Sequence, residues 1–366
     1  MGELRLMKGN EVLAEAVIRC GCDGYFGYPI TPQSEIMEKL MERQPWTETG
    51  MVVLQAESEV AAINMVYGAA GTGKKVMTSS SSPGVSLMAE GISYIAGAEL
   101  PCLIVNVQRG GPGLGTIQPS QADYFQSVKG GGHGDYKMLV LAPSSVQEMN
   151  DFVDLAFELA FKYRNPAMIL TDGAIGQMME KVELSDYKKR WTEEEVVEKN
   201  GSWATTGKPA SRQRNVITSL ELDSDKMEQN NLRFQAKYRR MEAEEQRYEA
   251  IQCDDAEYIF VAYGTSARVC QKAMEIARDK GLKVGLLRPI TLFPFPKNIV
   301  KELAPKVKGF LSVEMNAGQM VEDIKQAVYE TQIYRKVEFF GRMGGIIPSP
   351  GEVVDALEQK LIGEEK

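Results

Sequence analysis

The hydrophobic and polar positions of the chain alternate between two patterns from about residue 9 to residue 172. Short apolar runs are separated by segments whose apolar residues recur every three or four positions. The runs predict strands and the segments between them predict helices, which together indicate a mostly parallel sheet covered on both faces. The predicted strands are residues 24–29, 51–56, 74–82, 100–108, 137–143 and 166–173, and the helices are 10–21, 34–43, 58–70, 84–98 and 145–163.

This alternation stops near residue 185 and resumes at Tyr258. The intervening segment is polar and broken at first, and then charged and helical with a thin apolar stripe. We interpret that stripe either as one face of a solvated linker helix or as an arm that covers a partner subunit. The second alternating region predicts a smaller α/β domain. We therefore expect three parts, at residues 1–185, 186–250 and 251–366.

Composition narrows the class of protein. Of the 366 residues, 43% are hydrophobic and 25% charged, which is typical of a globular protein. The net charge of −8 argues against nucleic-acid binding. No apolar run reaches the roughly 18 residues that span a membrane, and the N-terminus lacks the apolar core of a signal peptide. We expect a cytoplasmic protein that binds neither nucleic acid nor membrane.

Cysteine and histidine usage argues against most metal sites in this chain. The five cysteines include no CxxC pair, so no iron–sulfur or zinc-ribbon motif is present. Cys20 and Cys22 could ligate a metal, but we prefer two ordinary thiols at a helix end. His133 is the single histidine, which excludes a zinc site with several histidine ligands. A Ser–His–Asp hydrolase would have to use His133 as its base, and the chain has no GxSxG motif to supply the nucleophilic serine.

Two segments that follow predicted strands are candidates for binding, because ligand sites in parallel sheets form at the carboxyl ends of strands. In "YPITP", Pro29 and Pro32 stiffen a turn that presents the hydroxyl of Thr31. In "RGGPGLG", the glycines allow close backbone approach to a ligand. Arg109, at the start of that loop, could pair with a carboxylate.

A third junction, "QAESEV", places Glu57 and Glu59 where a strand passes into a helix. Acidic residues in a first helical turn are ordinary, because they complement the helix dipole. However, Glu59 is followed by a strongly apolar run and could be partly buried, and burial raises the pKa of a carboxyl group.

The segment "GAAGTGKK", Gly68–Lys75, resembles a phosphate-binding loop only superficially. Lys75 stands where the motif requires a Ser or Thr for magnesium. The segment also follows a predicted helix and precedes a strand, which is the reverse of the required order. An NTPase is therefore a minor alternative.

Seven motifs in order carry a family resemblance. They are "GYPITP", "ESEVAA", "SSSPGVSLM", "VQRGGPGLGTIQPSQAD", "TDG", "LRPITLFPFP" and "VEMNAGQM". The set resembles the alpha subunit of the 2-oxoacid:ferredoxin oxidoreductases, and residues 109–136 look most like the branched-chain (2-oxoisovalerate) type. The resemblance covers nearly the whole chain apart from residues 186–250.

The resemblance implies a thiamine diphosphate pyrimidine-binding domain followed by a transketolase C-terminal-like domain with a structural role. It implies a beta subunit that holds the diphosphate and Mg²⁺, and a ferredoxin-like subunit, with iron–sulfur clusters on partner subunits only. CoA would be the co-substrate and external ferredoxin the electron acceptor.

The same resemblance assigns site residues. It makes Glu59 the catalytic glutamate beside pyrimidine N1′ of the cofactor, with Glu57 as the rival, and it gives substrate binding to Thr31 and Arg109. The further residues that it places against the cofactor are Tyr28, Pro29, Ile30, Ser82, Pro83 and Gly84. A 2-oxoglutarate enzyme subunit and a non-catalytic scaffold paralogue remain as alternatives.

Overall fold

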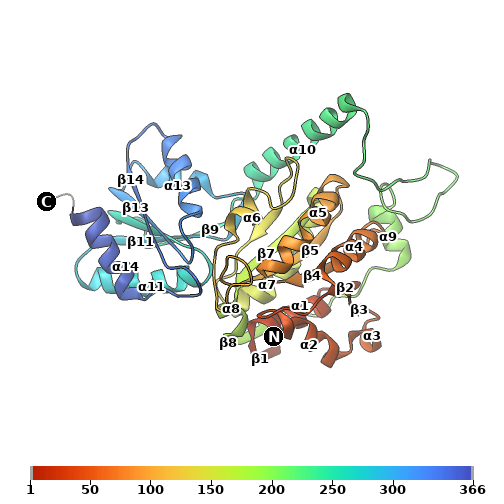
Figure 1. Ribbon diagram of the computed structural model, residues 1–366, viewed down its shortest axis with the longest axis horizontal. Helices are drawn as coiled ribbons and strands as arrows, with labels where there is room; N and C mark the ends of the chain where they lie inside the picture. The colour runs from red at the N-terminus through yellow and green to blue at the C-terminus, as the bar shows by residue number, and fades with distance from the viewer. Residues whose placement is uncertain (1–2, 364–366) are drawn as a thin grey trace.

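A seven-stranded sheet forms the centre of the N-terminal part of the chain in the computed structural model, which describes residues 3–363 (Figure 1). All neighbouring strands are parallel except the edge strand β12, which is antiparallel to β6. The spatial order is β12 (Thr291–Phe293), β6 (Leu139–Leu141), β7 (Pro166–Asp172), β5 (Cys102–Gln108), β4 (Val76–Ser80), β2 (Gly24–Gly27) and β3 (Val52–Gln55).

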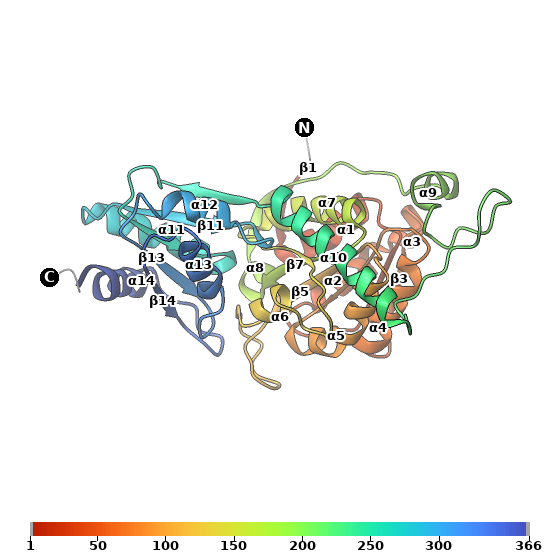
Figure 2. The same ribbon diagram turned by 90° about the horizontal axis from the view of Figure 1, so that it is seen from above.

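Helices cover both faces of this sheet, as the sequence pattern predicts. Figure 2 shows α1 (Gly9–Arg19) and α7 (Val146–Tyr163) on one side of it, and α4 (Glu59–Ala70) and α5 (Ser82–Gly97) on the other. The shorter helices are α2 (Ser34–Arg43), α3 (Pro45–Glu48), α6 (Tyr124–Val128) and α8 (Gly173–Gln177).

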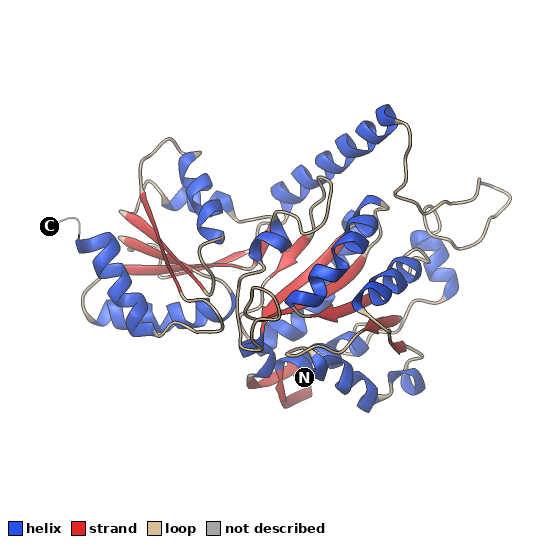
Figure 3. Ribbon diagram, viewed as in Figure 1, coloured by secondary structure: helices blue, strands red, loops and turns tan. Residues whose placement is uncertain are grey.

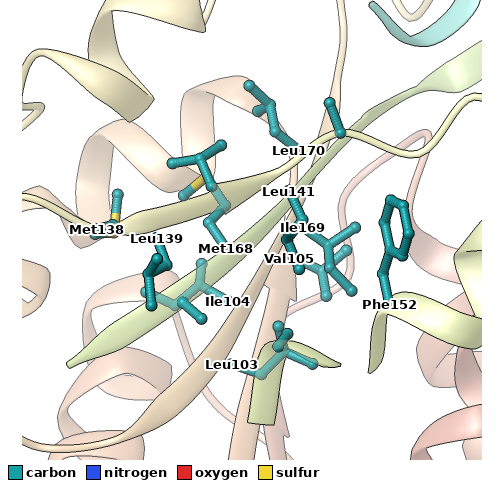
Figure 4. Close-up of a cluster of buried hydrophobic side chains, with 14 of the residues drawn as sticks. Leu103, Ile104, Val105, Met138, Leu139, Leu141, Phe152, Met168, Ile169 and Leu170 are labelled. Atoms are coloured by element: carbon teal, nitrogen blue, oxygen red, sulfur yellow. The ribbon is translucent and has the colours of Figure 1, made fainter. Parts of the chain in front are cut away.

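The core lies on β5 and β7, in which every residue is buried. Their Val, Ile, Leu and Met side chains pack with those of the neighbouring strand β6 and of α7 (Figure 4). Strands buried on both faces read as continuous apolar runs, which is why these strands could be located in the sequence.

The C-terminal part of the chain forms a second, five-stranded sheet. Its order is β14 (Lys336–Gly341), β13 (Gly309–Glu314), β10 (Tyr258–Val261), β11 (Val284–Pro289) and β9 (Tyr248–Ile251), with only β9 antiparallel. Its helices are α11 (Gly264–Asp279), α12 (Lys297–Leu303), α13 (Met320–Tyr329) and α14 (Pro350–Leu357), and α14 continues into a π-helical turn, Glu358–Ile362. The α/β class predicted for both parts is confirmed.

Two helices occupy the polar segment between the sheets, α9 (Glu193–Asn200) and α10 (Ser224–Glu244), and a long irregular loop joins them (Figure 3). The thin apolar stripe of α10 packs onto the N-terminal part of its own chain, where Phe234, Tyr238 and Met241 are buried. Lys237 Nζ anchors the helix there, at 3.1 Å from Glu99 Oε1.

Two pairings were not expected from the sequence. β1 (Glu3–Lys8) forms an antiparallel ribbon with β8 (Met179–Leu184). The three residues of β12 leave the C-terminal part and extend the first sheet at β6. Within residues 3–363, no helix is both long and apolar enough to cross a membrane.

Candidate functional site

The predicted site residues lie together at the carboxyl ends of β2, β3, β4 and β5. These strands are parallel neighbours, so the segments that follow them meet at one edge of the sheet. Arg109 links the loops after β2 and β5, because Nη1 donates to the carbonyl oxygen of Thr31 at 2.9 Å and Nη2 donates to that of Leu114 at 3.0 Å. The side chain of Thr31 is exposed.

The first turn of α5 is tied to the same loop. The backbone N–H of Arg109 donates to Ser82 Oγ at 3.1 Å, and that hydroxyl donates to the carbonyl oxygen of Arg109 at 3.2 Å. Ser82 begins a helix that Pro83 initiates, since proline has no N–H that needs a partner. The predicted residues Ser82, Pro83 and Gly84 therefore lie beside Arg109.

Glu59 is the first residue of α4, and it is buried, with 6% of the residue exposed. Ser58 caps this helix by accepting a hydrogen bond from Ala61 N. A Cβ atom at Gly84 would lie 2.8 Å from Glu59 Oε1 and 2.0 Å from Ser80 Oγ, so only glycine leaves room for the carboxylate.

No residue between 3 and 363 donates a hydrogen bond to the carboxylate of Glu59. The carboxylate is therefore an open acceptor on a residue that is otherwise buried, and it is available to a bound group. Glu57, the rival, is exposed and accepts a hydrogen bond from Ser58 Oγ at 3.2 Å. The geometry therefore favours Glu59 over Glu57 as a residue that faces a bound group.

The turn that carries Tyr28, Pro29 and Ile30 is half-buried, and hydrogen bonds from a buried side chain hold it in place. The buried side chain of Gln33 donates to the carbonyl oxygen of Tyr28 at 3.0 Å and accepts from Ser79 Oγ at 2.7 Å. Such a network fixes the path of the turn in addition to the stiffness of its prolines.

Sequence reasoning missed both Gln33 and Ser79. The run of four serines at 79–82 was the available signal, because Ser79 and Ser80 end an otherwise apolar strand and their hydroxyls need partners.

Asp123 is a further residue that sequence reasoning missed, although it lies in the "QAD" motif. Burial raises the pKa of its carboxyl group, while hydrogen bonds with Ser82 and Asn106 oppose that shift. Asn106 Nδ2 donates to Asp123 Oδ2 at 2.9 Å. The carboxyl is thus held next to the first turn of α5, on the side of Arg109.

The minor alternatives find little support. Cys20 and Cys22 are buried, and burial raises the pKa of the Cys20 thiol to about 12, as expected of structural thiols. Residues 68–75 run from α4 through a turn toward β4, the order that argues against a phosphate-binding loop. Lys74 Nζ in that turn pairs with Glu193 Oε1 at 2.5 Å.

Comparison with known families decides the assignment. Residues 15–253 match the family model described as pyruvate flavodoxin/ferredoxin oxidoreductase, thiamine diphosphate-binding. Residues 256–353 match pyruvate:ferredoxin oxidoreductase core domain II. The chain belongs to the 2-oxoacid:ferredoxin oxidoreductases. The family resemblance drawn from the seven motifs is therefore confirmed.

Curated relatives cover almost the whole chain. The ketoisovalerate oxidoreductase subunit VorB of Methanothermobacter thermautotrophicus is 51% identical over 356 residues, 97% of each chain. The 2-oxoglutarate synthase subunit KorA of Methanocaldococcus jannaschii is 35% identical over 99% of this chain and 100% of its own length.

A solved structure gives the same result. It is the 2-oxoglutarate:ferredoxin oxidoreductase from Magnetococcus marinus with 2-oxoglutarate, coenzyme A and succinyl-CoA bound. It has a TM-score of 0.85 and 25% identity, and the match covers 98% of this chain and 66% of that one.

Membership settles several general points. The chain is one subunit of a multi-subunit oxidoreductase whose electron acceptor is an iron–sulfur protein, and its N-terminal part is of the thiamine diphosphate-binding type.

Proposed function

We propose that this chain supplies the pyrimidine half of the thiamine diphosphate site and the carboxylate site for a 2-oxoacid. The observation that carries the proposal is the carboxylate of Glu59, which belongs to a residue that is only 6% exposed, has no partner within residues 3–363 and faces Gly84 in the first turn of α5. Because Gly84 has no side chain, Glu59 and Ser80 can pack against the first turn of α5. The free acceptor of Glu59 suits an aminopyrimidine ring that presents a protonated nitrogen.

Each site residue then has a chemical role. Glu59 holds the proton at the pyrimidine nitrogen, and Arg109 pairs with the carboxylate of the oxoacid. The exposed hydroxyl of Thr31 donates a hydrogen bond to the oxoacid from a turn that has little freedom left to lose. Thiamine diphosphate supplies, when bound, the chemistry that allows the oxoacid to lose CO₂.

The overall reaction joins a 2-oxoacid and CoA. One 2-oxoacid anion, one CoA and two oxidised ferredoxins give one acyl-CoA, one CO₂, two reduced ferredoxins and one proton. The relatives and the neighbour with bound coenzyme A support CoA as the acceptor.

We assign the diphosphate and Mg²⁺ to a beta subunit, and the iron–sulfur clusters to a ferredoxin-like subunit and other partners. No group of three or more His, Cys, Asp or Glu side chains within residues 3–363 is placed to hold a metal ion.

For the substrate we propose 2-oxoisovalerate. The relative at 51% identity is named for ketoisovalerate, whereas the relatives named for 2-oxoglutarate are at 35% or less. Arg109 is also the only cation among the described residues that line the cleft beside it, so a second carboxylate would find no counter-charge there.

A turnover comparison tests this assignment. The complex, purified with its partner subunits, is assayed for CoA-dependent reduction of a viologen dye with 2-oxoisovalerate, 2-oxoglutarate and pyruvate. We expect the highest kcat/KM with 2-oxoisovalerate, by at least tenfold. A preference for 2-oxoglutarate would overturn the substrate assignment and leave the family intact.

A further inference from the structure

Asp123 stands immediately before helix α6, in the position where an aspartate side chain ordinarily caps its own helix. It makes no such cap. The backbone N–H of Phe125 donates instead to Gln319 Oε1 of the C-terminal part, at 2.7 Å. The carboxyl group of Asp123 is therefore left to serve another part of the molecule, and its partners lie on β5 and in the first turn of α5.

Two buried amides near the end of β5 fix Asp123 in place. Asn106 Nδ2 donates to Asp123 Oδ2 at 2.9 Å, and the backbone N–H of Asp123 donates to Gln108 Oε1 at 3.1 Å. Asn106 and Gln108 are both buried, and Gln108 Nε2 donates in turn to the carbonyl oxygen of Thr171 at 3.2 Å. Since one strand binds both the side chain and the main chain of Asp123, its carboxyl group has a defined position.

Ser82 connects this carboxyl group to Arg109. The Ser82 hydroxyl hydrogen-bonds with Asp123, and it accepts from the backbone N–H of Arg109 at 3.1 Å. A hydroxyl has one proton to donate. The carbonyl oxygen of Arg109, at 3.2 Å, and the carboxyl of Asp123 compete for that proton, and an ionised carboxylate is the stronger acceptor. Asp123 thus orients the hydroxyl so that a lone pair remains for the N–H of Arg109.

Arg109 and Asp123 are the only charged side chains among the described residues that line the cleft beside the glycine-rich loop. No ion pair joins the two within residues 3–363. The guanidinium group is bound by the carbonyl oxygens of Thr31 and Leu114 instead, and its Nε is buried without a partner. The positive charge of Arg109 therefore stays available to a substrate, while Asp123 acts on the main chain of the same residue.

We propose that Asp123 is a positioning residue for the 2-oxoacid site. Acting through the hydroxyl of Ser82, it fixes the main chain at Arg109 and so the direction in which the guanidinium group meets the carboxylate of the oxoacid. The inference rests on the proposed function and deepens it, because it adds a residue that does not touch the substrate to those that orient it.

Two single variants and their combination test this path. Asp123→Asn keeps the shape of the side chain and removes its charge, and Ser82→Ala removes the hydroxyl. Both variants and the double variant are prepared in the full complex, with Asp225→Asn in the exposed first turn of α10 as the control. Reduction of a viologen dye is measured at saturating CoA and thiamine diphosphate while 2-oxoisovalerate is varied. The affinity for thiamine diphosphate is measured separately.

We expect each single variant to raise the KM for 2-oxoisovalerate about tenfold, with kcat within about threefold of wild type. Asp123→Asn should leave the affinity for thiamine diphosphate within about threefold, and the control should leave all three quantities unchanged. Because the two residues act along one path, the double variant should raise KM by about twentyfold at most, whereas independent effects would multiply to about 100-fold. An unchanged KM in Asp123→Asn, or a rise of about 100-fold in the double variant, would overturn the inference.

A role in folding alone would give a different result. If Asp123→Asn only reduced the amount of folded complex, kcat would fall and KM would equal that of wild type, and the inference would be wrong. If the wild-type complex reduced no dye with any 2-oxoacid, the proposed function would be overturned and this inference with it.

Discussion

Arg109 and Thr31 meet although 78 positions separate them in the chain. The guanidinium spans the turn after β2 and the loop after β5, so it braces the site as well as supplying its positive charge. Its planar fork reaches two carbonyl oxygens at once, a geometry that the single ammonium of lysine cannot reproduce.

The first prediction therefore concerns Arg109→Lys in the complex. We expect kcat/KM for 2-oxoisovalerate to fall about 100-fold, equivalent to about 3 kcal/mol, because charge-assisted hydrogen bonds are lost. The effect should appear mainly in KM, with the apparent affinity for thiamine diphosphate within threefold of wild type. Steady-state kinetics measures both, with Arg240→Lys on α10 as the control, and an unchanged KM would contradict the role of Arg109.

At the scale of elements, the chain offers two helices that begin alike. The sequence Ser-Pro-Gly stands at the start of both, at residues 82–84, where α5 begins with Ser82, and at residues 349–351, where Ser349 caps α14. A Cβ atom at Gly351 would meet nothing within 4 Å, whereas one at Gly84 would clash with Ser80 and Glu59. The surroundings therefore leave room for a side chain at position 351 but require glycine at position 84.

We predict opposite effects for Gly84→Ala and Gly351→Ala. Alanine in an open helical position stabilises by up to about 1 kcal/mol, so Gly351→Ala should raise the free energy of unfolding slightly. Gly84→Ala should lower that free energy and weaken thiamine diphosphate binding at least tenfold, because Glu59 is displaced. Chemical denaturation and a fluorescence titration with the cofactor measure the two effects. Equal cofactor affinity in both variants would contradict the requirement for glycine at position 84.

Helix α10 ends in a network around Glu245. Burial opposes ionisation of Glu245, but hydrogen bonds from Lys162, Arg247 and Tyr163 outweigh it and lower the pKa of the carboxyl to about 2. Lys162 and Tyr163 belong to α7, so the network fastens the end of the arm to the N-terminal part of the chain.

A folded-state pKa below the ordinary value of 4.5 means that Glu245 stabilises the fold fully above about pH 5 and loses this effect as the pH falls toward 2. Glu245→Gln should therefore lower the free energy of unfolding by about 1–3 kcal/mol at pH 7, and by less at pH 4. Urea denaturation of the full chain at both values tests this, with Glu228→Gln on the exposed face of α10 as the control. If Glu245→Gln lowered the free energy of unfolding more at pH 4 than at pH 7, the stabilising role of the ionised carboxylate would be contradicted.

For the whole molecule, the motifs "QPSQAD" and "VEMNAGQM" join the two parts of the chain. Gln121 exchanges hydrogen bonds with Tyr263, Ser266, Met315 and Asn316, all of the C-terminal part. Replacing it by an apolar residue of similar shape leaves several of those buried groups without partners.

We expect Gln121→Met to lower the free energy of unfolding of the full chain by about 2–4 kcal/mol, since each unsatisfied buried group costs about 1–3 kcal/mol. Gln271→Met, on the exposed surface of α11, should change it by less than about 0.5 kcal/mol. Urea denaturation with two spectroscopic probes measures both. Similar free energies of unfolding for the two variants would show that Gln121 does not stabilise the contact between the two parts of the chain.

The sequence pattern predicted the strands that alternate with helices in the first sheet, the short β6 included, and missed β1, β8 and β12. Runs such as Cys102–Gln108 carry enough apolar residues to mark a strand by themselves. β12 has three residues, and its position beside β6 depends on where the second part of the chain docks, which no local pattern contains. The ribbon of β1 and β8 pairs segments that lie far apart in the chain, and this too is decided by tertiary packing.

The candidate site was predictable where the chemistry lies in a single loop. Arg109, Thr31 and Glu59 each follow a strand and carry a polar group out of apolar surroundings. Asp123 and Gln33 contribute to the site through hydrogen bonds with residues of other segments, and no local sequence pattern indicates those hydrogen bonds.

The most direct test of the account is the pair Glu59→Gln and Glu57→Gln in the complex with its partner subunits. The assay is 2-oxoisovalerate- and CoA-dependent reduction of ferredoxin under anaerobic conditions. We predict that Glu59→Gln lowers kcat about 1,000-fold, since proton transfer by a placed side chain contributes about 10²–10⁴-fold, and that Glu57→Gln stays within twofold of wild type. Near-normal activity of Glu59→Gln would contradict the account and favour a non-catalytic scaffold.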